Sequence, residues 1–262
     1  MDSNLLRFTV FLGVLLICML IEIIVPRRTL SEPRWYRWLN NLSLVGFNSI
    51  VLQLTLPLLA LEAAIWAQSQ QIGLLHIIEL PLWLAKIVSL LAMDMIIYWQ
   101  HRLFHTIPVL WALHKTHHSD QDIDVTTGAR FHPIEIWLSM VIKIATVVIL
   151  GVPPVAVIAF EIILNASAMF NHSNMRIPYA VDTWVRKFLV TPDMHRVHHS
   201  TIRAETDSNY GFCLAIWDRL FGSYIEQPKL GHLDMDIGIH QFRCPNEQRL
   251  DKILTQPFRE DS

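Results

Sequence analysis

The sequence predicts an all-α, polytopic membrane protein. Three observations support this prediction: 52% of the 262 residues are hydrophobic, the mean hydropathy is positive, and the apolar residues gather into five long runs. A membrane-spanning helix needs about 20 mostly apolar residues, and soluble domains seldom contain several such runs. The formal net charge is only -2, and the cationic residues form no basic arm, so nothing indicates nucleic acid as a partner.

The first two runs are predicted to be membrane helices. Residues 8–25 could be mistaken for a signal peptide, but the run is longer than a signal-peptide core and no small-x-small cleavage pattern follows it. We therefore expect a retained helix. The second run, residues 42–67, contains Pro57, which predicts a kink inside the membrane. The three cysteines form no CxxC pair, which argues against a disulfide framework or a thiolate zinc site.

The third run extends from Leu80 toward Trp99. Residues 134–150 and 155–170 form two further apolar runs, which the helix-breaking sequence Gly-Val-Pro-Pro joins. Each of these two runs is only about 25 Å long at a rise of 1.5 Å per residue. Since this barely spans a bilayer, we expect either a full hairpin or a re-entrant one.

Loop charges predict the orientation. Four arginines, Arg27, Arg28, Arg34 and Arg37, follow the first run, whereas the loop between the second and third runs carries no Lys or Arg. The positive-inside rule therefore places the first loop in the cytoplasm. Counting crossings from there puts the end of the third helix, and everything after residue 170, on the cytoplasmic side.

Charged residues inside the apolar runs predict two ion pairs, because an isolated charge at the centre of a membrane helix costs about 2.5 to 3.5 kcal/mol. Lys143 and Glu161 lie almost equally far from the Gly-Val-Pro-Pro turn, and Glu62 and Lys86 almost equally far from the middle of the uncharged loop. Antiparallel helices would therefore bring each pair to one depth. The alternative is that each charge faces a water-filled cavity by itself.

Histidine-rich motifs follow the third run. HRLFH begins at residue 101, HKTHH at residue 114, and TPDMHRVHHS at residue 191. In the last motif Thr191 is a good N-cap and Pro192 suits the first helical position, so a helix is expected to start there. Residues three or four apart share a helix face. The motifs contain eight histidines: His101, His105, His114, His117, His118, His195, His198 and His199.

Such clustering predicts a metal site, since neutral imidazole is the commonest transition-metal ligand. Eight imidazoles are too many for one ion and suit two metals with four or five nitrogen ligands each. His172, in FNHSN, is the predicted ninth ligand. His132 is a possible tenth, and its alternative role is to cap the backbone beside Pro133. Nitrogen ligands alone admit iron, copper, zinc or nickel.

Two further residues share the helix face of His101 and His105. Asp94 and Tyr98 precede His101 at helical spacings, so they are the candidate catalytic residues, expected to orient a ligand ring or to line a lipid tunnel. Tyr98 could instead belong to an aromatic belt at the membrane surface. The amphipathic segments VDTWVRKFLV and FCLAIWDRLF are expected to lie in the membrane interface and cover the site.

The order HRLFH, HKTHH, NHSN and TPDMHRVHH, followed by DSNYG and WDRLFGSY, resembles the fatty acid hydroxylase and sterol desaturase superfamily of membrane di-iron oxygenases. The resemblance covers roughly residues 80–225, and it divides the chain into N-terminal membrane helices (1–79), a catalytic domain (80–225) and a C-terminal cytoplasmic tail (226–262). It implies that the eight motif histidines are metal ligands, and His172 matches a histidine that some members carry between the second and third motifs. It also implies a cytoplasmic, histidine-rich helical cap that holds the dinuclear site.

The expected function is therefore hydroxylation or desaturation of a lipid, with two iron ions and O2. An unactivated C–H bond offers no acidic proton or electrophilic carbon, so a redox metal is needed, and zinc has no second oxidation state. No flavin, nucleotide or haem motif is found, so the electrons are expected from a separate ferredoxin or cytochrome with its reductase. The rival hypothesis is a non-redox protein, either a zinc-dependent membrane hydrolase or a metal-binding membrane protein. Such a hydrolase would need an acid or base beside the metal, for which Asp94, Glu135 and the loop aspartates are the candidates.

Overall fold

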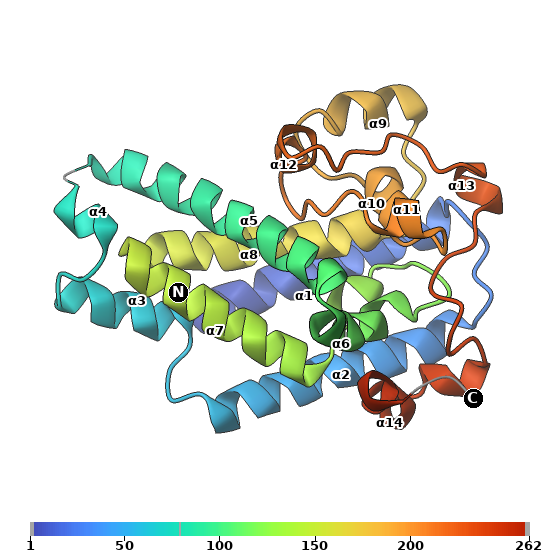
Figure 1. Ribbon diagram of the computed structural model, residues 1–262, viewed down its shortest axis with the longest axis horizontal. Coiled ribbons are helices and arrows are strands. Elements are labelled where there is room, and N and C mark those ends of the chain that lie inside the picture. The colour runs from blue at the N-terminus through green and yellow to red at the C-terminus, as the bar shows by residue number, and fades with distance from the viewer. Residues whose placement is uncertain (1–2, 79, 260–262) are drawn as a thin grey trace.

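The computed structural model describes residues 3–78 and 80–259, and all regular elements in these ranges are helices. Figure 1 shows that the longest helices run along the long axis of the molecule. Five segments are long and apolar enough to cross a membrane. The prediction of a polytopic helical membrane protein is thus confirmed. The segments are α1 (Ser3–Ile24), the stretch Arg34–Ile77, α5 (Leu82–Thr106), α7 (Pro133–Leu150) and α8 (Pro154–His172).

The second span is broken at the predicted proline. It consists of α2 (Arg34–Thr55), α3 (Ala60–Ser69) and the single turn α4 (Leu74–Ile77). Leu56, which precedes Pro57, has an extended backbone, as expected for a residue before proline. The predicted kink is therefore a complete break between two helices. Helix α2 also begins earlier than expected, so Arg34 and Arg37 belong to a helix and not to a loop.

Helices α7 and α8 form a hairpin whose tip rests on the loop after α3. Gly151 ends α7 in the left-handed conformation, with φ of 69°, and Pro154 starts α8. A Cβ atom on Gly151 would lie 2.8 Å from the His76 ring and 3.0 Å from the Ile72 carbonyl oxygen. Only glycine fits this turn without strain, because the backbone of the facing loop approaches so closely.

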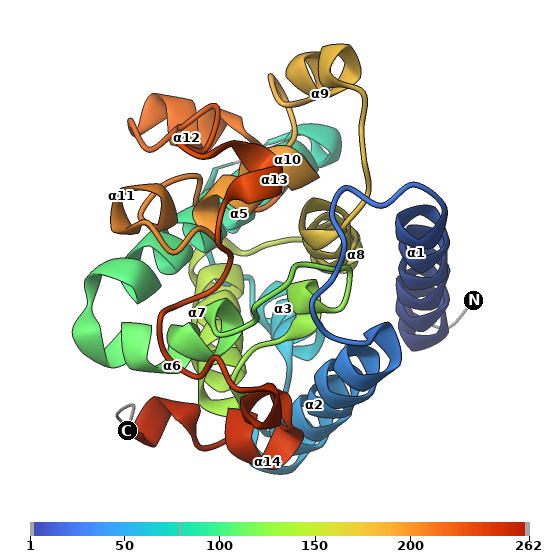
Figure 2. The same ribbon diagram turned by 90° about the vertical axis from the view of Figure 1, so that its right-hand side faces the viewer.

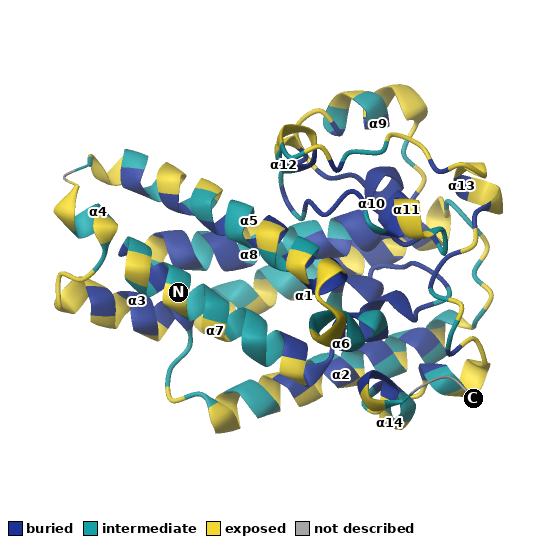
Figure 3. Cartoon of the chain, in the orientation of Figure 1, coloured by how far each residue is buried: buried dark blue, intermediate teal, exposed yellow. Residues whose placement is uncertain are grey.

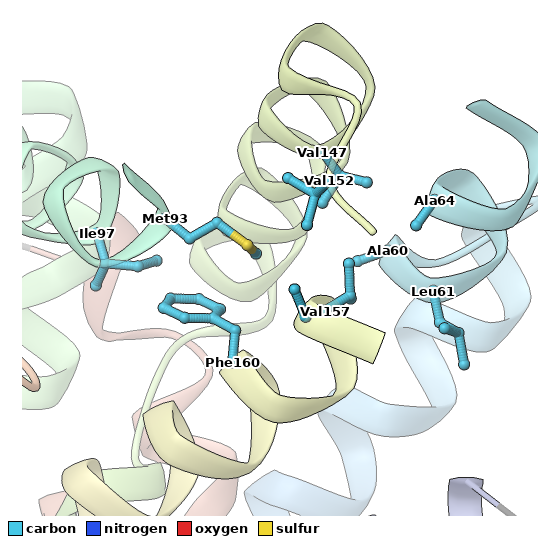
Figure 4. Close-up of a cluster of buried hydrophobic side chains, with 10 residues drawn as sticks. Ala60, Leu61, Ala64, Met93, Ile97, Val147, Val152, Val157 and Phe160 are labelled. Atoms are coloured by element: carbon cyan, nitrogen blue, oxygen red, sulfur yellow. The ribbon is translucent and has the colours of Figure 1, made fainter. Parts of the chain in front are cut away.

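A hydrophobic core joins this hairpin to α3 and α5. Small residues of α3, such as Ala60 and Ala64, allow the helix backbones to approach one another, and Phe160 and Met93 fill the space between α8 and α5 (Figure 4). This packing fixes the end of the bundle that lies away from the histidines. The cluster consists of Ala60, Leu61, Ala64, Met93, Ile97, Val147, Val152, Ala156, Val157 and Phe160.

One of the two predicted ion pairs is present. The Lys143 ammonium lies 3.6 Å from a Glu161 carboxylate oxygen, so α7 and α8 are joined as expected, and Arg7 of α1 also pairs with Glu161. The predicted pair between Glu62 and Lys86 is wrong: among the described residues these two form no ion pair. Helix α3 packs chiefly against α7 and α8, and Glu62 accepts a hydrogen bond from the backbone of its own N-terminus, Leu59 N, at 3.1 Å.

Short helices form a cap at one end of the bundle, which Figure 2 shows from that end. Figure 3 shows that α10 is buried in the cap, whereas α9 exposes much of its surface. Trp184, Ile216 and Leu220 are exposed apolar residues of the two predicted interfacial segments. The cap comprises α6 (Pro108–His118), η1 (Thr127–Ala129), α9 (Tyr179–Val185), α10 (Pro192–His198), α11 (Arg203–Thr206) and α12 (Ile216–Leu220).

The C-terminal segment lies against this cap. It contains α13 (Gly231–Asp234), η2 (Pro245–Gln248), α14 (Leu250–Ile253) and η3 (Gln256–Phe258). The Gln256 side chain accepts a hydrogen bond from Ser119 Oγ at 2.8 Å, and Gly238 N donates to the His199 carbonyl at 2.9 Å. The predicted tail is thus packed onto the C-terminal ends of α6 and α10, the helices that carry two of the histidine motifs.

Candidate metal centre

The structure brings all nine histidines that were predicted as ligands together between α5, α6, α8 and α10. They are buried and form two groups, and within each group one potential ligand atom per residue lies within 4.8 Å of the others. The two groups match the predicted division into four or five nitrogen ligands per metal. The first group is His101, His105, His114, His118 and His198, and the second is His117, His172, His195 and His199.

Each H-x-x-H-H motif contributes to both groups. On α6, His114 and His118 are one helical turn apart and join the first group, while His117 joins the second. On α10, His195 and the capping residue His199 join the second group, while His198 joins the first. The first and last histidines of each motif share a helix face, and the middle one points to the neighbouring group.

Local helix signals hold these motifs in place. Thr191 caps α10 by accepting a hydrogen bond from Met194 N at 3.3 Å, and Pro192 occupies the first turn, both as predicted. Pro108 starts α6 in the same way. On α5, the rings of His101 and His105 lie 5.2 Å apart on one face. Helix α8 delivers His172 at its last position.

Hydrogen bonds at Nδ1 orient most of the rings. Because a carbonyl or carboxylate oxygen only accepts, each such Nδ1 carries the proton and leaves the Nε2 lone pair free for a metal. Asp207 Oδ1 lies 3.4 Å from His105 Nδ1. The acceptors are the carbonyl oxygens of Tyr210 for His101 (2.8 Å), Arg130 for His117 (3.2 Å), Ala168 for His172 (2.7 Å) and Ser208 for His198 (2.7 Å), and Glu135 Oε1 for His114 (2.6 Å).

The remaining nitrogen atoms fit bound metal ions. Among the nine clustered histidines, six buried Nε2 atoms find no hydrogen-bond partner within the described part of the chain: those of His101, His105, His114, His118, His198 and His199. In the second group, His172 Nε2 lies 3.1 Å from His117 Nε2 and 3.0 Å from His195 Nε2. Converging lone pairs without donors are unfavourable in a buried site, and a cation at the centre of each group would satisfy them.

Burial also keeps the imidazoles neutral. Desolvation lowers the pKa of His114 to about 3. Neutral rings retain the lone pairs that ligation requires. Burial, followed by the neighbouring histidines, holds the pKa well below the ordinary value for His117, His118, His195, His198 and His199.

Buried charges support the loop that follows α6. Arg37 donates to Asp124 Oδ2 at 2.7 Å and pairs with Asp120, while Arg130 Nε donates to the Thr116 carbonyl at 3.0 Å. From the sequence, Arg37 is only a topology signal, and Asp120 and Asp124 are expected either to support the ligand histidines from a loop or to be solvated; their ion pairs with Arg37 are not predicted. The Arg130 carbonyl oxygen, which accepts the hydrogen bond from His117 Nδ1, belongs to the segment that these contacts hold in place.

Asp94 and Tyr98 face the chain segment 210–223, and neither forms a hydrogen bond with a histidine of the described chain. The Asp94 carboxylate accepts hydrogen bonds from Trp217 Nε1 (2.8 Å) and from the backbone of Leu214 (3.1 Å). The Tyr98 hydroxyl forms a hydrogen bond with Ser223 Oγ at 2.8 Å. Tyr98 is completely buried, so the alternative of an exposed aromatic belt is wrong.

His132 belongs to neither group of the described histidines. Its Nδ1 accepts a hydrogen bond from Ile134 N at 3.2 Å, and its Nε2 lies 3.2 Å from the Leu254 carbonyl oxygen. It therefore caps α7, which is the alternative role considered for it beside Pro133.

A cavity of about 400 Å³ leads from the first group into the membrane bundle. His101, His114 and Glu135 line one end of it, and neither Asp94 nor Tyr98 is part of its wall. Glu135 Oε2 is buried without a hydrogen-bond partner in the described structure. The apolar wall includes Ile97, Phe104, Ile136, Met140, Leu164, Met169 and Phe212. Such a cavity suits a hydrocarbon chain.

Comparisons with known proteins agree with this geometry. The family model described as Fatty acid hydroxylase matches residues 86–223, more than half of the chain. Similar proteins include alkylglycerol monooxygenase of Xenopus tropicalis (34% identical over 159 residues, 58% of this chain and 33% of that protein), ornithine lipid hydroxylase of Rhizobium tropici (28% over 157 residues, 60% and 46%), and lathosterol oxidase of Mus musculus (26% over 147 residues, 54% and 46%). The aligned region covers less than half the length of these relatives. No solved structure matches the chain.

Proposed function

Since the chain belongs to the fatty acid hydroxylase family, we propose that it is a membrane-bound di-iron oxygenase that hydroxylates or desaturates a lipid with O2. The observation that carries the proposal is the pair of buried histidine groups beside an apolar cavity. The names of the relatives, a monooxygenase, a hydroxylase and an oxidase of lipids, support the same class of reaction.

The first group would hold one iron ion through five histidines and the second group would hold the other through four. Bound iron supplies the redox chemistry through which O2 oxidises an unactivated C–H bond, which zinc does not supply. The protein keeps the ligand rings neutral by burial and presents their Nε2 atoms from Nδ1 hydrogen bonds. The apolar cavity wall excludes water and brings a hydrocarbon chain to His101 and His114.

Asp94 and Tyr98 act in this proposal as positioning residues and not through direct contact with the substrate. Both hold the segment 210–223. The Tyr210 carbonyl in that segment accepts the hydrogen bond from His101 Nδ1. The two residues would thus orient a ligand ring indirectly, through the backbone.

We place the centre on the cytoplasmic side, where a separate ferredoxin or cytochrome with its reductase would deliver electrons. The support is the distribution of charge in the loops: Arg27 and Arg28 lie on the cap side of α1, whereas the loop at the other end of the bundle, residues 70–80, has no Lys or Arg.

Metal analysis of the purified protein tests the proposal. We expect about two iron ions per chain, as the two groups require, and loss of the oxidised lipid product from cells that produce the His198→Ala variant. Stoichiometric zinc together with an unchanged lipid profile in that variant would refute the oxygenase and favour a zinc-dependent hydrolase, for which the free oxygen of Glu135 beside His114 is the candidate base.

A further inference from the structure

The cavity has a charged end as well as the end that His101 and His114 line. Away from the histidines its wall contains Arg7 of α1, Lys143 of α7 and Glu161 of α8, together with Asn165. These side chains come from three membrane helices, and the apolar wall separates them from His114. A charged side chain inside a membrane helix costs free energy. Where such side chains occur, they usually face a cavity and mark a functional site.

The three charges do not cancel. Arg7 pairs with Glu161 and also donates to Asn4 Oδ1 at 2.5 Å, and Lys143 lies 3.6 Å from the other oxygen of Glu161. Two cations and one carboxylate leave one net positive charge at this end. Among the described residues of the cavity wall, the one other charged group is Glu135, which forms a hydrogen bond with His114 at the opposite end.

Lys143 carries the excess charge. Its ammonium group has three N–H donors, yet within the described residues it forms no hydrogen bond, and its nearest carboxylate oxygen stays 3.6 Å away. Its side chain retains 12% exposure and lines the cavity. In surroundings of low dielectric such an ammonium group is strongly stabilised by an anion with oxygen acceptors.

The wall between the two ends fits a hydrocarbon chain. Ile136, Met140 and Lys143 lie at helical spacings on one face of α7, and all three line the cavity. Lys143 is eight residues beyond Glu135, which corresponds to about 12 Å along the helix. A chain whose polar end lies at Lys143 would therefore bring a carbon about 12 Å away to the histidines.

We propose that Lys143, with the Arg7–Glu161 pair, binds an anionic oxygen-rich group of the ligand, a carboxylate or a phosphate, and that the hydrocarbon chain runs from there toward His101 and His114. The direction of the chain rests on the proposed oxygenase function. The anion site itself does not, because it depends only on the charges at this end. The site would select acidic amphiphiles over neutral ones of the same length.

Binding measurements test this site. The full-length protein is placed in nanodiscs of an uncharged phospholipid, with empty nanodiscs as the blank, and its affinity is measured for radiolabelled dodecanoate, dodecyl phosphate and dodecanol. We expect the wild type to bind at least one anionic ligand about tenfold more tightly than dodecanol, the size of one charge-assisted hydrogen bond. Comparison of the two anions shows whether a carboxylate or a phosphate is preferred.

Variants connect the preference to Lys143. Lys143→Met leaves the neutral Arg7–Glu161 pair and should bind all three ligands alike, whereas Lys143→Arg should keep the preference. Lys86→Met is the matched control, because Lys86 is also on a membrane helix but does not line the cavity. If Lys143→Met does not fold, Lys143→Gln serves in its place, with size-exclusion chromatography as the check.

Two results would overturn the inference: equal affinity of the wild type for all three ligands, or an unchanged anion preference in Lys143→Met. Iron content is measured on the same samples. A wild-type protein that contains iron but binds the three ligands equally would contradict only the anion site. A wild-type protein that prefers the anionic ligands but contains no iron would contradict only the oxygenase function.

Discussion

The contact between Glu135 and His114 allows a direct test of how the protein supports its proposed metal ligands. Its Oε1 atom lies 2.6 Å from His114 Nδ1, and both residues are buried. Replacement by leucine removes the acceptor and leaves a buried N–H donor without a partner, which costs about 1 to 3 kcal/mol. The loss of such a supporting carboxylate typically weakens metal binding by about 10- to 100-fold. Glu135→Gln keeps an acceptor oxygen but loses the charge, so its effect should be smaller.

The assay is a competition between the purified protein and a chelator, with the bound iron measured at each chelator concentration. Glu62→Gln is the control, since Glu62 is also a carboxylate of a membrane segment but caps α3 and belongs to neither histidine group. We expect iron affinity to fall in the order wild type, Glu135→Gln, Glu135→Leu. If Glu135→Leu retains the affinity of the wild type within about twofold, then the hydrogen bond does not support the ligand, contrary to the general expectation.

Three further predictions follow from the geometry. His172→Ala leaves three histidines in its group, and His105→Ala leaves four in the other. As the chelator concentration rises, the iron content of His172→Ala should therefore fall from about two toward about one per chain at a lower concentration than that of His105→Ala. The opposite order would contradict the assignment of histidines to the two groups. Tyr98→Phe removes the 2.8 Å hydrogen bond to Ser223 and should lower the free energy of unfolding by about 1 kcal/mol, seen as a lower thermal midpoint; an unchanged midpoint would show that the bond contributes nothing. Cys244 is exposed while the other two cysteines are buried, so an impermeant maleimide should label it in inverted membrane vesicles and not in intact cells; labelling in intact cells would reverse the proposed orientation.

The sequence predicts well which histidines lie together, because helical spacing is a local property. His114 and His118 share a face of α6 wherever that helix lies, and the cap formed by Thr191 is equally local. The pairing of Lys143 with Glu161 was also predictable, since the short Gly-Val-Pro-Pro turn forces α7 and α8 to be antiparallel neighbours.

What the sequence did not predict depends on packing between distant segments. The pairing of Glu62 with Lys86 assumed that α3 and α5 are neighbours, but the break at Pro57 lets α3 pack against α7 and α8. The partners of Asp94 arrive from residues more than 100 positions later. No periodicity in the sequence relates such segments, so the acceptors that orient the histidine rings were not identified.

The shared use of α6 and α10 by both histidine groups has a consequence for assembly. Each of these helices carries histidines of both groups, so in the proposed di-iron protein the first ion to bind would already fix the helices that the second ion needs. Most of the conformational entropy that the cap loses on ordering is then lost when the first ion binds, and the second ion meets a preorganised set of nitrogen atoms. In the wild type, where both groups are intact, metal loading should therefore be cooperative, with little of the singly loaded protein at equilibrium.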